Sequence, residues 1–338
     1  DHLAKRLGFY AVTNKYSYQG ATPETDAFLN IDYLISKHKE ERIRTFDWFD
    51  TVDDRNLYQN HCALGLGFMV SENILQWDYE KTNPFEVINQ LMLSATGEEL
   101  RPYRYFGMPE WTAEGCELTT DSWADWSYTA EDGVDDTVTY VYTSEKSQDL
   151  YMYFKAAHCT KVEVIRDEES KSYSDEDGHI FHVGEVEAGE TVTLIFHLDD
   201  AYDKGNIKLI AAEHDMDVFY QIYDKLKEQR WVTDKVTSTS LSGNITAAQD
   251  GVMFTSIPYD KGWTITVDGE KIEPEKIADA FIGISLSKGE HRIEMKYCPE
   301  GFIPGLILTC AAGILFVLMY LKEKRDMNRR KNPENIQA

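Results

Sequence analysis

Two groups of aromatic and polar side chains have the composition of a sugar-binding surface. The first group is Tyr259, Asp260, Lys261 and Trp263, and the second is the pair Trp123 and Trp126. Sugars pack their C–H-rich faces on aromatic rings, while their hydroxyl groups need carboxylate or amide partners. We therefore expect carbohydrate binding at Tyr259, Asp260 and Trp263, or at the tryptophan pair. The structural alternatives are a core position in a hairpin for Trp263 and a turn cap for Asp260.

The sequence contains no motif that assigns catalysis, a metal site or a cofactor. Its nine histidines are scattered, and His179 and His182, which flank Phe181, are typical of a solvated strand edge. The aspartate pairs, such as Asp53-Asp54, are typical of turns. A glycosidase with two catalytic carboxylates stays an alternative, because their separation is a property of the folded chain. We expect no catalytic residue, metal ligand or cofactor in this chain.

The longest apolar segment, Phe302–Leu321, has the length and composition of a transmembrane helix. It contains no charged residue, and about 20 helical residues cover the ~30 Å hydrocarbon core of a bilayer. Six basic residues follow within positions 322–331, as is typical of the cytoplasmic side. We therefore expect residues 1–301 to be extracytoplasmic and residues 322–338 to form a cytoplasmic tail. A signal peptide or an earlier membrane segment is then expected before residue 1.

The acidic composition limits the partners of the chain. The 338 residues carry a formal net charge of −25, and the tail has six basic and three acidic residues, so residues 1–321 carry −28. Nucleic acid is excluded as a partner because phosphate binding needs a concentrated basic face. The spacing of the exterior cysteines leaves both disulfides and free thiols open; they are Cys62, Cys116, Cys159 and Cys298.

Residues 1–110 mix helix and strand signals and predict an α+β region. Thr22 before Pro23 is a typical helix start, and Asn83 before Pro84 begins the clearest helix, which Gly97 ends. The strands expected here are the end of 27–36, Arg42–Phe49, Arg55–Gln59 and Leu64–Val70.

Apolar and polar residues alternate with a period of two between residues 111 and 213, which predicts a β-sandwich of jelly-roll type. Asp167–Gly178 is expected to form a turn, and residues 214–230 a connecting amphipathic helix. The strands expected in the sandwich are Thr137–Thr143, Asp149–Phe154, Lys161–Ile165, His179–Val183, Thr191–Leu198 and Asn206–Ile210.

Residues 231–300 predict a further, membrane-proximal β domain. Asp268-Gly269 is a typical two-residue hairpin turn, and Trp263, Ile265 and Val267 share one face of the strand before it. The expected fold class is mainly β. It combines an α+β N-terminal part, jelly-roll-like β-sandwich domains and one C-terminal transmembrane helix, 302–321.

An ordered set of segments also carries a resemblance to a known family. The segments are Leu57–Val70, Asn83–Leu91, Ile257–Gly269, Ala280–Ile284, Lys288–His291 and Pro299–Gly301, followed by the apolar helix. Together they resemble the YfhO family of bacterial membrane proteins over nearly the whole chain.

The resemblance implies a function that the residues alone do not. Members of the family resemble polytopic GT-C-type glycosyltransferases, which add sugars from a lipid-phosphate-linked donor to lipoteichoic acid or another cell-wall polymer. Their catalytic acidic residue is expected in an early exterior loop between membrane helices that this sequence does not contain. The chain is then expected to be the exterior C-terminal domain and last helix of such an enzyme, where it positions the acceptor or stabilises the enzyme. The alternative is a non-enzymatic, membrane-anchored carbohydrate-binding or cell-surface interaction module.

Overall fold

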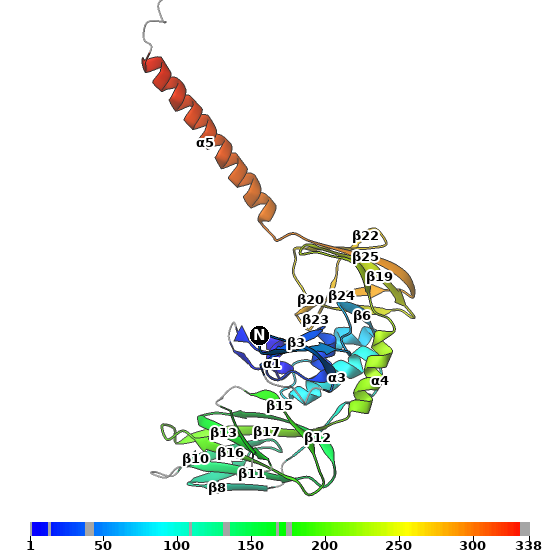
Figure 1. Ribbon diagram of the computed structural model, residues 1–338, viewed down its shortest axis with the longest axis vertical. Coiled ribbons are helices and arrows are strands. Elements are labelled where there is room, and N and C mark those ends of the chain that lie inside the picture. The colour runs from blue at the N-terminus through cyan, green and yellow to red at the C-terminus, as the bar shows by residue number, and fades with distance from the viewer. Residues whose placement is uncertain are drawn as a thin grey trace, which may run out of the picture. The chain divides into compact units, whose positions relative to one another are not determined.

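The computed structural model describes residues 2–12, 15–37, 44–107, 110–130, 136–166, 169–173 and 178–331. The described chain is mainly β, which confirms the predicted fold class (Figure 1). It divides into two compact units, and each unit consists of three segments that are separate in the sequence. The first unit is Asp1–Val232, Asn244–Tyr259 and Pro274–His291, and the second is Thr233–Gly243, Asp260–Glu273 and Arg292–Ala338. The finer domain boundaries expected from the sequence stay a prediction.

Two antiparallel sheets of the first unit form the β-sandwich. One sheet contains β7 (Tyr103–Phe106), β9 (Cys116–Thr120), β10 (Asp125–Ala130), β12 (Gln148–Ala156), β15 (His179–Val186) and β17 (Lys204–His214). Its order is β15-β12-β17-β10-β9, and β7 pairs with the end of β17. The other sheet contains β8 (Glu110–Glu114), β11 (Thr137–Thr143), β13 (Cys159–Arg166), β14 (Glu169–Tyr173) and β16 (Thr191–Leu198), in the order β14-β13-β16-β11-β8.

The inward-facing residues of both sheets form one apolar core. Alternate residues of β11 and β16 are buried, among them Val138, Tyr140, Leu194 and Phe196. Phe154 of β12 meets Phe196 edge-on, with ring centroids 5.8 Å apart. The period-two alternation therefore gives each sheet one buried face, as a sandwich requires.

The segment between residues 167 and 178 contains a strand, and its prediction as a turn was wrong. β14 pairs with β13 along Glu169–Tyr173 at the edge of its sheet. Most of its side chains are exposed. An edge strand pairs its backbone on one side only, so it needs no apolar alternation and resembles a polar turn in sequence.

A second core lies on the outer face of the β12–β15–β17 sheet, where helices cover it. The helices are α1 (His2–Arg6), α2 (Pro23–Phe28), the 3-10 helix η1 (Glu72–Gln76), α3 (Pro84–Thr96) and α4 (Met216–Lys227). As predicted, the side chains of Thr22 and Asn83 cap α2 and α3, and Gly97 ends α3 with a φ of 71°. The expected connecting helix is α4, which buries Phe219 and Ile222.

A four-stranded sheet joins segments that are far apart in the sequence. It contains β6 (Gly67–Val70), β20 (Gly251–Pro258), β23 (Glu275–Ile277) and β24 (Phe281–Leu286), in the order β23-β24-β20-β6. Phe68 of β6 pairs with Phe254 of β20. Their rings and the ring of Phe28 lie 5.1–5.6 Å apart in the second core. Early and late parts of the chain therefore share one apolar core.

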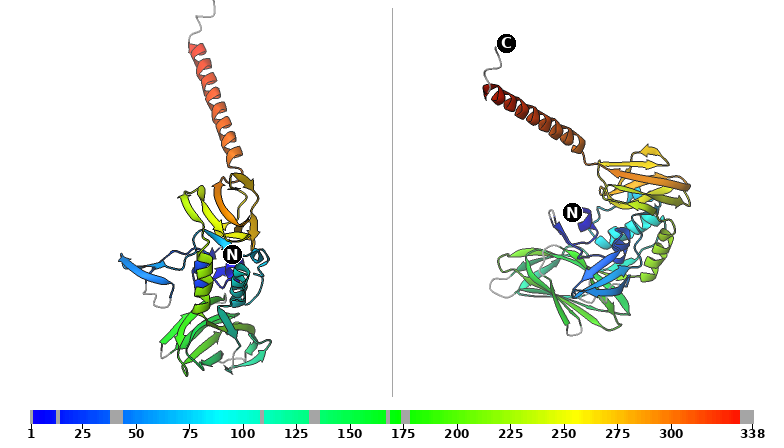
Figure 2. Two further views of the ribbon diagram at one scale, coloured as in Figure 1. Left: turned by 90° about the vertical axis from the view of Figure 1, so that its right-hand side faces the viewer. Right: turned by 45° about the horizontal axis from the view of Figure 1, so that its top comes forward.

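A three-stranded sheet projects from the rest of the first unit (Figure 2). It contains β3 (Tyr33–Ser36), β4 (Phe46–Val52) and β5 (Arg55–Asn60), with β5 in the centre. Asp53 and Asp54 form the predicted turn, with φ angles of 46° and 59°. The expected start of β4 at Arg42 lies outside the described residues. Near the N-terminus, β1 (Ala11–Val12) and β2 (Lys15–Tyr16) form a separate two-stranded sheet.

The second unit contains most of a five-stranded sheet. Its strands are β18 (Val232–Val236), β19 (Ser240–Ala247), β21 (Trp263–Val267), β22 (Glu270–Ile272) and β25 (Gly289–Tyr297), in the order β18-β19-β25-β21-β22. Asp268 and Gly269, with φ angles of 53° and 87°, form the predicted hairpin turn. Ile265 is fully buried, whereas Trp263 on the same face is half-buried.

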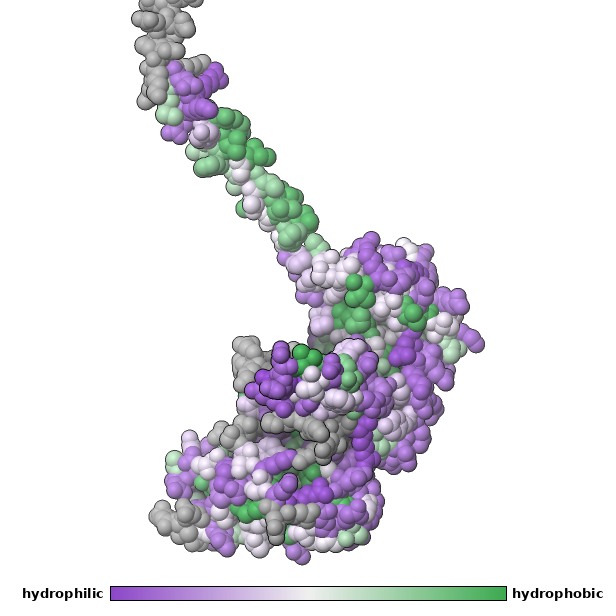
Figure 3. All heavy atoms as spheres, viewed as in Figure 1, coloured by the Kyte–Doolittle hydropathy of each residue, from purple (hydrophilic) through white to green (hydrophobic). Residues whose placement is uncertain are grey.

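The C-terminal helix α5 (Phe302–Lys331) is the one helix of the described residues that is long and apolar enough to cross a membrane. The most apolar 18-residue window in its span Phe302–Asn328 has a mean hydropathy of 2.4, and none of this window is buried by the residues that the structure describes. Figure 3 shows an apolar column that becomes hydrophilic toward its C-terminal end. An apolar helix without protein contacts is stable in lipid and unfavourable in water.

Candidate functional site

The sandwich carries a groove of about 950 Å³ that is lined largely by aromatic side chains. It lies between β7, β8, the start of β10 and the connection from β11 to β12. The aromatic residues in its lining are Tyr105, Phe106, Trp111, Trp123, Trp126 and Tyr142, and the polar residues include Arg104, Ser122, Lys146 and Gln148. This composition fits a ligand that has apolar faces and several hydrogen-bonding groups.

Trp123 and Tyr105 form the exposed rim of this aromatic groove. Trp123 is 50% exposed and stacks on Tyr105, with ring centroids 5.6 Å apart and an angle of 26° between the planes. The hydroxyl of Tyr105 donates to Oε2 of Glu86 on α3 at 3.3 Å. The stacked pair is thus held in place before any ligand binds, which reduces the entropy lost on binding.

Trp111 and Trp126 form the floor of the aromatic groove. Trp126 is 5% exposed and packs on Trp111, with ring centroids 4.6 Å apart. The indole Nε1 of Trp111 is buried and has no hydrogen-bond partner among the described residues. A buried donor without a partner is costly.

Charged side chains surround the polar end of the aromatic groove. Arg104 Nε donates to Oε2 of Glu213 at 3.0 Å, and Lys146 pairs with Oε1 of the same carboxylate. Partial burial alone would raise the pKa of Glu213, but the hydrogen bonds from Lys146 and Arg104 lower it. The ionised carboxylate therefore holds both cations at the edge of the groove.

The structure brings two of the five predicted sugar-binding residues together, since Trp123 and Trp126 line the same groove. Trp123 offers an exposed ring, whereas Trp126 is part of the packed floor. Sequence reasoning missed Tyr105 and Trp111. A usable signal was the concentration of three of the seven tryptophans between residues 111 and 126.

The other predicted residues do not lie in the aromatic groove. In the second unit, Asp260 Oδ1 accepts from the backbone N–H of Gly262 at 2.7 Å, which is the geometry of a turn cap. Trp263 packs on Tyr297 with ring centroids 5.0 Å apart. In the first unit, Tyr259 donates its N–H to the carbonyl of Ala280 at 2.8 Å. Sugar binding at Tyr259, Asp260 and Trp263 stays a prediction.

A buried ionic cluster lies on the outer face of the β12–β15–β17 sheet. His214 and Glu24 are both fully buried and pair at 2.8 Å, and Tyr103 Oη donates to the other oxygen of Glu24 at 2.9 Å. Asp149 lies 2.5 Å from His182 and 3.6 Å from His214. Burial lowers the pKa of His214, but the charge of Glu24 and hydrogen bonds with Asp149 and Glu24 outweigh it and raise the pKa to about 9.

The interpretation of His179 and His182 as a solvated strand edge was wrong. His179 is buried, and His182 is stacked on Tyr151 and paired with Asp149. The reason is that His179 packs against Phe154 and Tyr173, while His182 packs on Tyr151 beside a cavity that residues 18–26 also line. Among the described residues no group of three or more histidines, cysteines or carboxylates could hold a metal ion. None of the five cysteines forms a disulfide within the described part of the chain.

The comparison with protein families shows to which family this chain belongs. The model of the family described as "Bacterial membrane protein YfhO" matches residues 1–309. This chain belongs to the YfhO family. The match confirms the family resemblance of the ordered segments, and α5 fits a membrane protein.

One curated YfhO relative is a Bacillus subtilis (strain 168) protein named "Uncharacterized protein YfhO". It is 32% identical to this chain over 78 residues, which are 23% of this chain and 9% of the relative. The aligned region is therefore a small part of a much longer protein.

Solved structures with local similarity to this YfhO chain include two carbohydrate-related proteins. A carbohydrate-binding module of family 29 is 13% identical, with a TM-score of 0.23, and the match covers 32% of this chain and 88% of the module. A Podospora anserina GH26-CBM35 β-(1,4)-mannanase is also 13% identical with a TM-score of 0.23, over 34% of this chain and 28% of the mannanase.

Proposed function

We propose that this YfhO-family chain is the extracytoplasmic C-terminal part of a polytopic membrane glycosyltransferase, and that its aromatic groove holds the acceptor glycan. The whole enzyme transfers a sugar from a lipid-phosphate-linked donor to lipoteichoic acid or another cell-wall polymer. Residues 1–301 lie outside the membrane, and the basic residues that follow Leu321 lie in the cytoplasm, consistent with the positive-inside rule. The family membership and α5 support attachment to a membrane.

The observation that carries this proposal is the half-exposed, pre-ordered Trp123–Tyr105 pair at the rim of the aromatic groove. A large exposed ring that packing holds in place is a surface on which the C–H face of a sugar can stack. The side chains of Ser122, Lys146 and Gln148 supply polar groups at the same groove, although the amide nitrogen of Gln148 already donates to Tyr142 and Ser144. These groups bind and orient a glycan and move no proton, so the proposed role is acceptor positioning.

The binding experiment compares Trp123→Ala with Trp48→Ala in the full chain in detergent. Both tryptophans are exposed, Trp123 at 50% and Trp48 on β4 at 59%, so the second variant is a matched control. Loss of a stacking contact of about 1.4 kcal/mol weakens binding about tenfold. We expect that loss for purified lipoteichoic acid with Trp123→Ala and unchanged binding with Trp48→Ala. Equal binding by both variants would contradict the role of the groove.

A transfer experiment separates the enzyme from a non-enzymatic binding module. Membranes that contain the full-length parent protein are supplied with a lipid-phosphate-linked sugar and the polymer acceptor. If the groove positions the acceptor, Trp123→Ala should raise KM for the polymer and leave kcat nearly unchanged. Glycan binding without transfer under any condition would favour the carbohydrate-binding or cell-surface interaction module.

A further inference from the structure

A second cavity lies on the opposite side of the sandwich from β8 and β9, next to the edge strand β15. It has a volume of about 260 Å³ and is lined by Tyr18, Asp26, Tyr151, Tyr173, Phe181 and His182, among others. Gly20, with a φ of 94°, is part of its wall. A Cβ at Gly20 would collide with the carbonyl oxygen of Gly8, so the path of this loop requires glycine. The volume is just below the ~300–1,000 Å³ of pockets for drug-sized ligands, which suits one sugar ring.

Asp26 is a buried carboxyl group of this cavity with one oxygen left unused. Its side chain belongs to α2, is 2% exposed, and accepts a hydrogen bond from Tyr18 Oη to Oδ2 at 2.9 Å. Oδ1 is buried and has no hydrogen-bond partner among the described residues. A buried polar atom without a partner is uncommon in folded proteins and calls for a ligand or water.

The neighbouring carboxylates differ from Asp26 because their oxygens are engaged. Glu24 uses one oxygen for His214 and the other for Tyr103. Asp149 faces His182 with one oxygen and His214 with the other. Of these three acids only Asp26 therefore has an oxygen free for a ligand.

We propose that this cavity is a second glycan-binding subsite, which takes one neutral sugar unit whose hydroxyl group hydrogen-bonds Oδ1 of Asp26. A sugar hydroxyl both donates and accepts, so it can satisfy a neutral carboxyl group that has no other partner. The aromatic walls are pre-ordered, since Tyr151 stacks on His182 at 4.3 Å and Tyr173 packs on Phe181 at 5.4 Å. These rings provide the apolar surface for the C–H face of the sugar.

The protonation of Asp26 favours a neutral ligand over an ammonium group. Burial raises the pKa of Asp26 to about 8, the hydrogen bond from Tyr18 opposes the shift, and the charge of Glu24 adds to it. Near pH 7 the carboxyl group therefore carries its proton and acts as a donor. The other titratable groups that face the cavity or the acid are Tyr151, Tyr173, His179 and His182, with His214 and Asp149 behind them.

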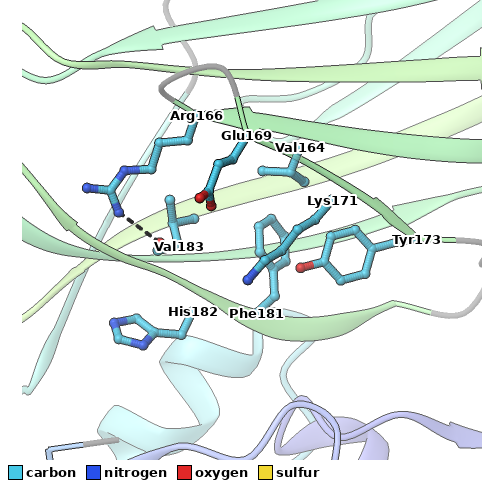
Figure 4. Close-up of a pocket in the computed structure, with 8 residues that line it drawn as sticks. All are labelled: Val164, Arg166, Glu169, Lys171, Tyr173, Phe181, His182 and Val183. Atoms are coloured by element: carbon cyan, nitrogen blue, oxygen red, sulfur yellow. Dashed lines mark hydrogen bonds between the residues drawn. The ribbon is translucent and has the colours of Figure 1, made fainter. Parts of the chain in front are cut away.

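A neighbouring cavity of about 290 Å³ continues this subsite around β15 and shares Tyr173, Phe181 and His182 with it. Figure 4 shows Phe181 and Val183 on one side of β15 and His182 on the other. Lys171 and Glu169 of β14 reach over the same strand, and Arg166 donates to the carbonyl of Val183 at 3.2 Å. A glycan longer than one unit would meet these polar groups as it leaves the Asp26 cavity.

The experiment measures binding of methyl glycosides of glucose, galactose and N-acetylglucosamine to the full chain in detergent by saturation-transfer NMR. Asp26→Leu removes both oxygens, keeps the branching of the side chain, and should weaken binding at least tenfold. Asp26→Asn keeps an acceptor for Tyr18 and presents an amide N–H to the ligand, so it should bind like the unchanged protein at pH 7. Asp200→Asn, at an exposed position, is the matched control.

The pH profile provides the second readout. Above pH 8 the ionised carboxylate still accepts a hydrogen bond from a sugar hydroxyl but no longer donates one, so the affinity of the unchanged protein should change as the pH rises through 8, whereas Asp26→Asn should bind equally from pH 6 to pH 9. Failure of all three glycosides to bind, unchanged binding by Asp26→Leu, or a pH profile of the unchanged protein that is identical to that of Asp26→Asn would each overturn the proposal. Trp123→Ala should leave glycoside binding in the Asp26 cavity unaffected. A failure of this proposal can therefore be distinguished from a failure of the proposed role of the aromatic groove.

Discussion

Replacing Asp26 by asparagine should stabilise the first unit strongly at neutral pH. Burial holds the pKa of Asp26 at about 8 in the folded chain, compared with 3.8 for an ordinary aspartate. At pH 7 the unfolded chain carries an ionised Asp26, and folding must therefore take up a proton. An asparagine has the same shape, keeps the hydrogen bond from Tyr18, and needs no proton.

The size of the effect follows from the difference between the two pKa values. The contribution of Asp26 to the unfolding free energy of the unchanged protein is fully present below pH 4. It falls as the pH rises toward the folded pKa of Asp26, about 8, and is constant above that pH. About three pH units separate the unfolded pKa from pH 7, and each unit corresponds to about 1.4 kcal/mol, so the expected gain for Asp26→Asn is about 4 kcal/mol. For a unit of this size that corresponds to a rise in Tm of roughly 10 °C.

The assay is thermal and urea unfolding of the full chain in detergent, followed by tryptophan fluorescence from pH 4 to pH 9. The difference in unfolding free energy between Asp26→Asn and the unchanged protein should be near zero at pH 4 and grow to its full value near pH 8. The titration of His214 is common to both proteins and cancels in this difference. Asp200→Asn should give a curve parallel to that of the unchanged protein. A pH-independent difference for Asp26→Asn would refute the reasoning, because it would show that Asp26 is not a buried, protonated acid.

Three further perturbations test other parts of the structure. Ile265→Ala should cost about 3 kcal/mol of unfolding free energy in thermal denaturation, and Trp263→Ala about 2 kcal/mol, because Ile265 is fully buried and Trp263 only half-buried; the reverse order would contradict the hairpin packing. His214→Ala should destabilise the first unit by about 3–5 kcal/mol in urea titrations, since it leaves Glu24 buried without its cation; a stable variant would show that water or another group replaces it. External protease on intact cells should remove residues 1–300 and spare a tag at the C-terminus, whereas loss of the tag alone would reverse the proposed orientation.

Local chemistry in the sequence predicted the elements that depend on few residues. Thr22 and Asn83 have side-chain oxygens that cap a helix whatever surrounds them, and proline follows each at the first helical position. The Asp268-Gly269 turn depends on two positive φ angles that those residue types allow. The alternation along β11 and β16 also appears unchanged as one buried face per strand.

The sites depend on distant contacts, which local patterns do not encode. Glu24 and His214 are separated by 190 residues, and neither residue type indicates burial. Tyr105 and Trp123 stack because β7 pairs with the end of β17, although β7 itself is too short to be predicted from its alternation. The same limit explains the misassigned histidines, since only the fold shows what covers β15.

The pairing of β6 with β20 makes completion of the first unit a late event during synthesis. β6 has no other strand partner among the described residues, and its ring contact with Phe254 is needed to close the second core. At about 5–20 residues per second, a ribosome needs roughly 10–40 s to advance from β6 to β20. During that interval Phe28, Phe68 and the apolar face of α3 are without part of their cover, so the unfinished chain exposes aromatic surface that a chaperone could bind. By the time β24 is made, α5 is the next helix to follow, so the core of the first unit closes shortly before the apolar helix is synthesised.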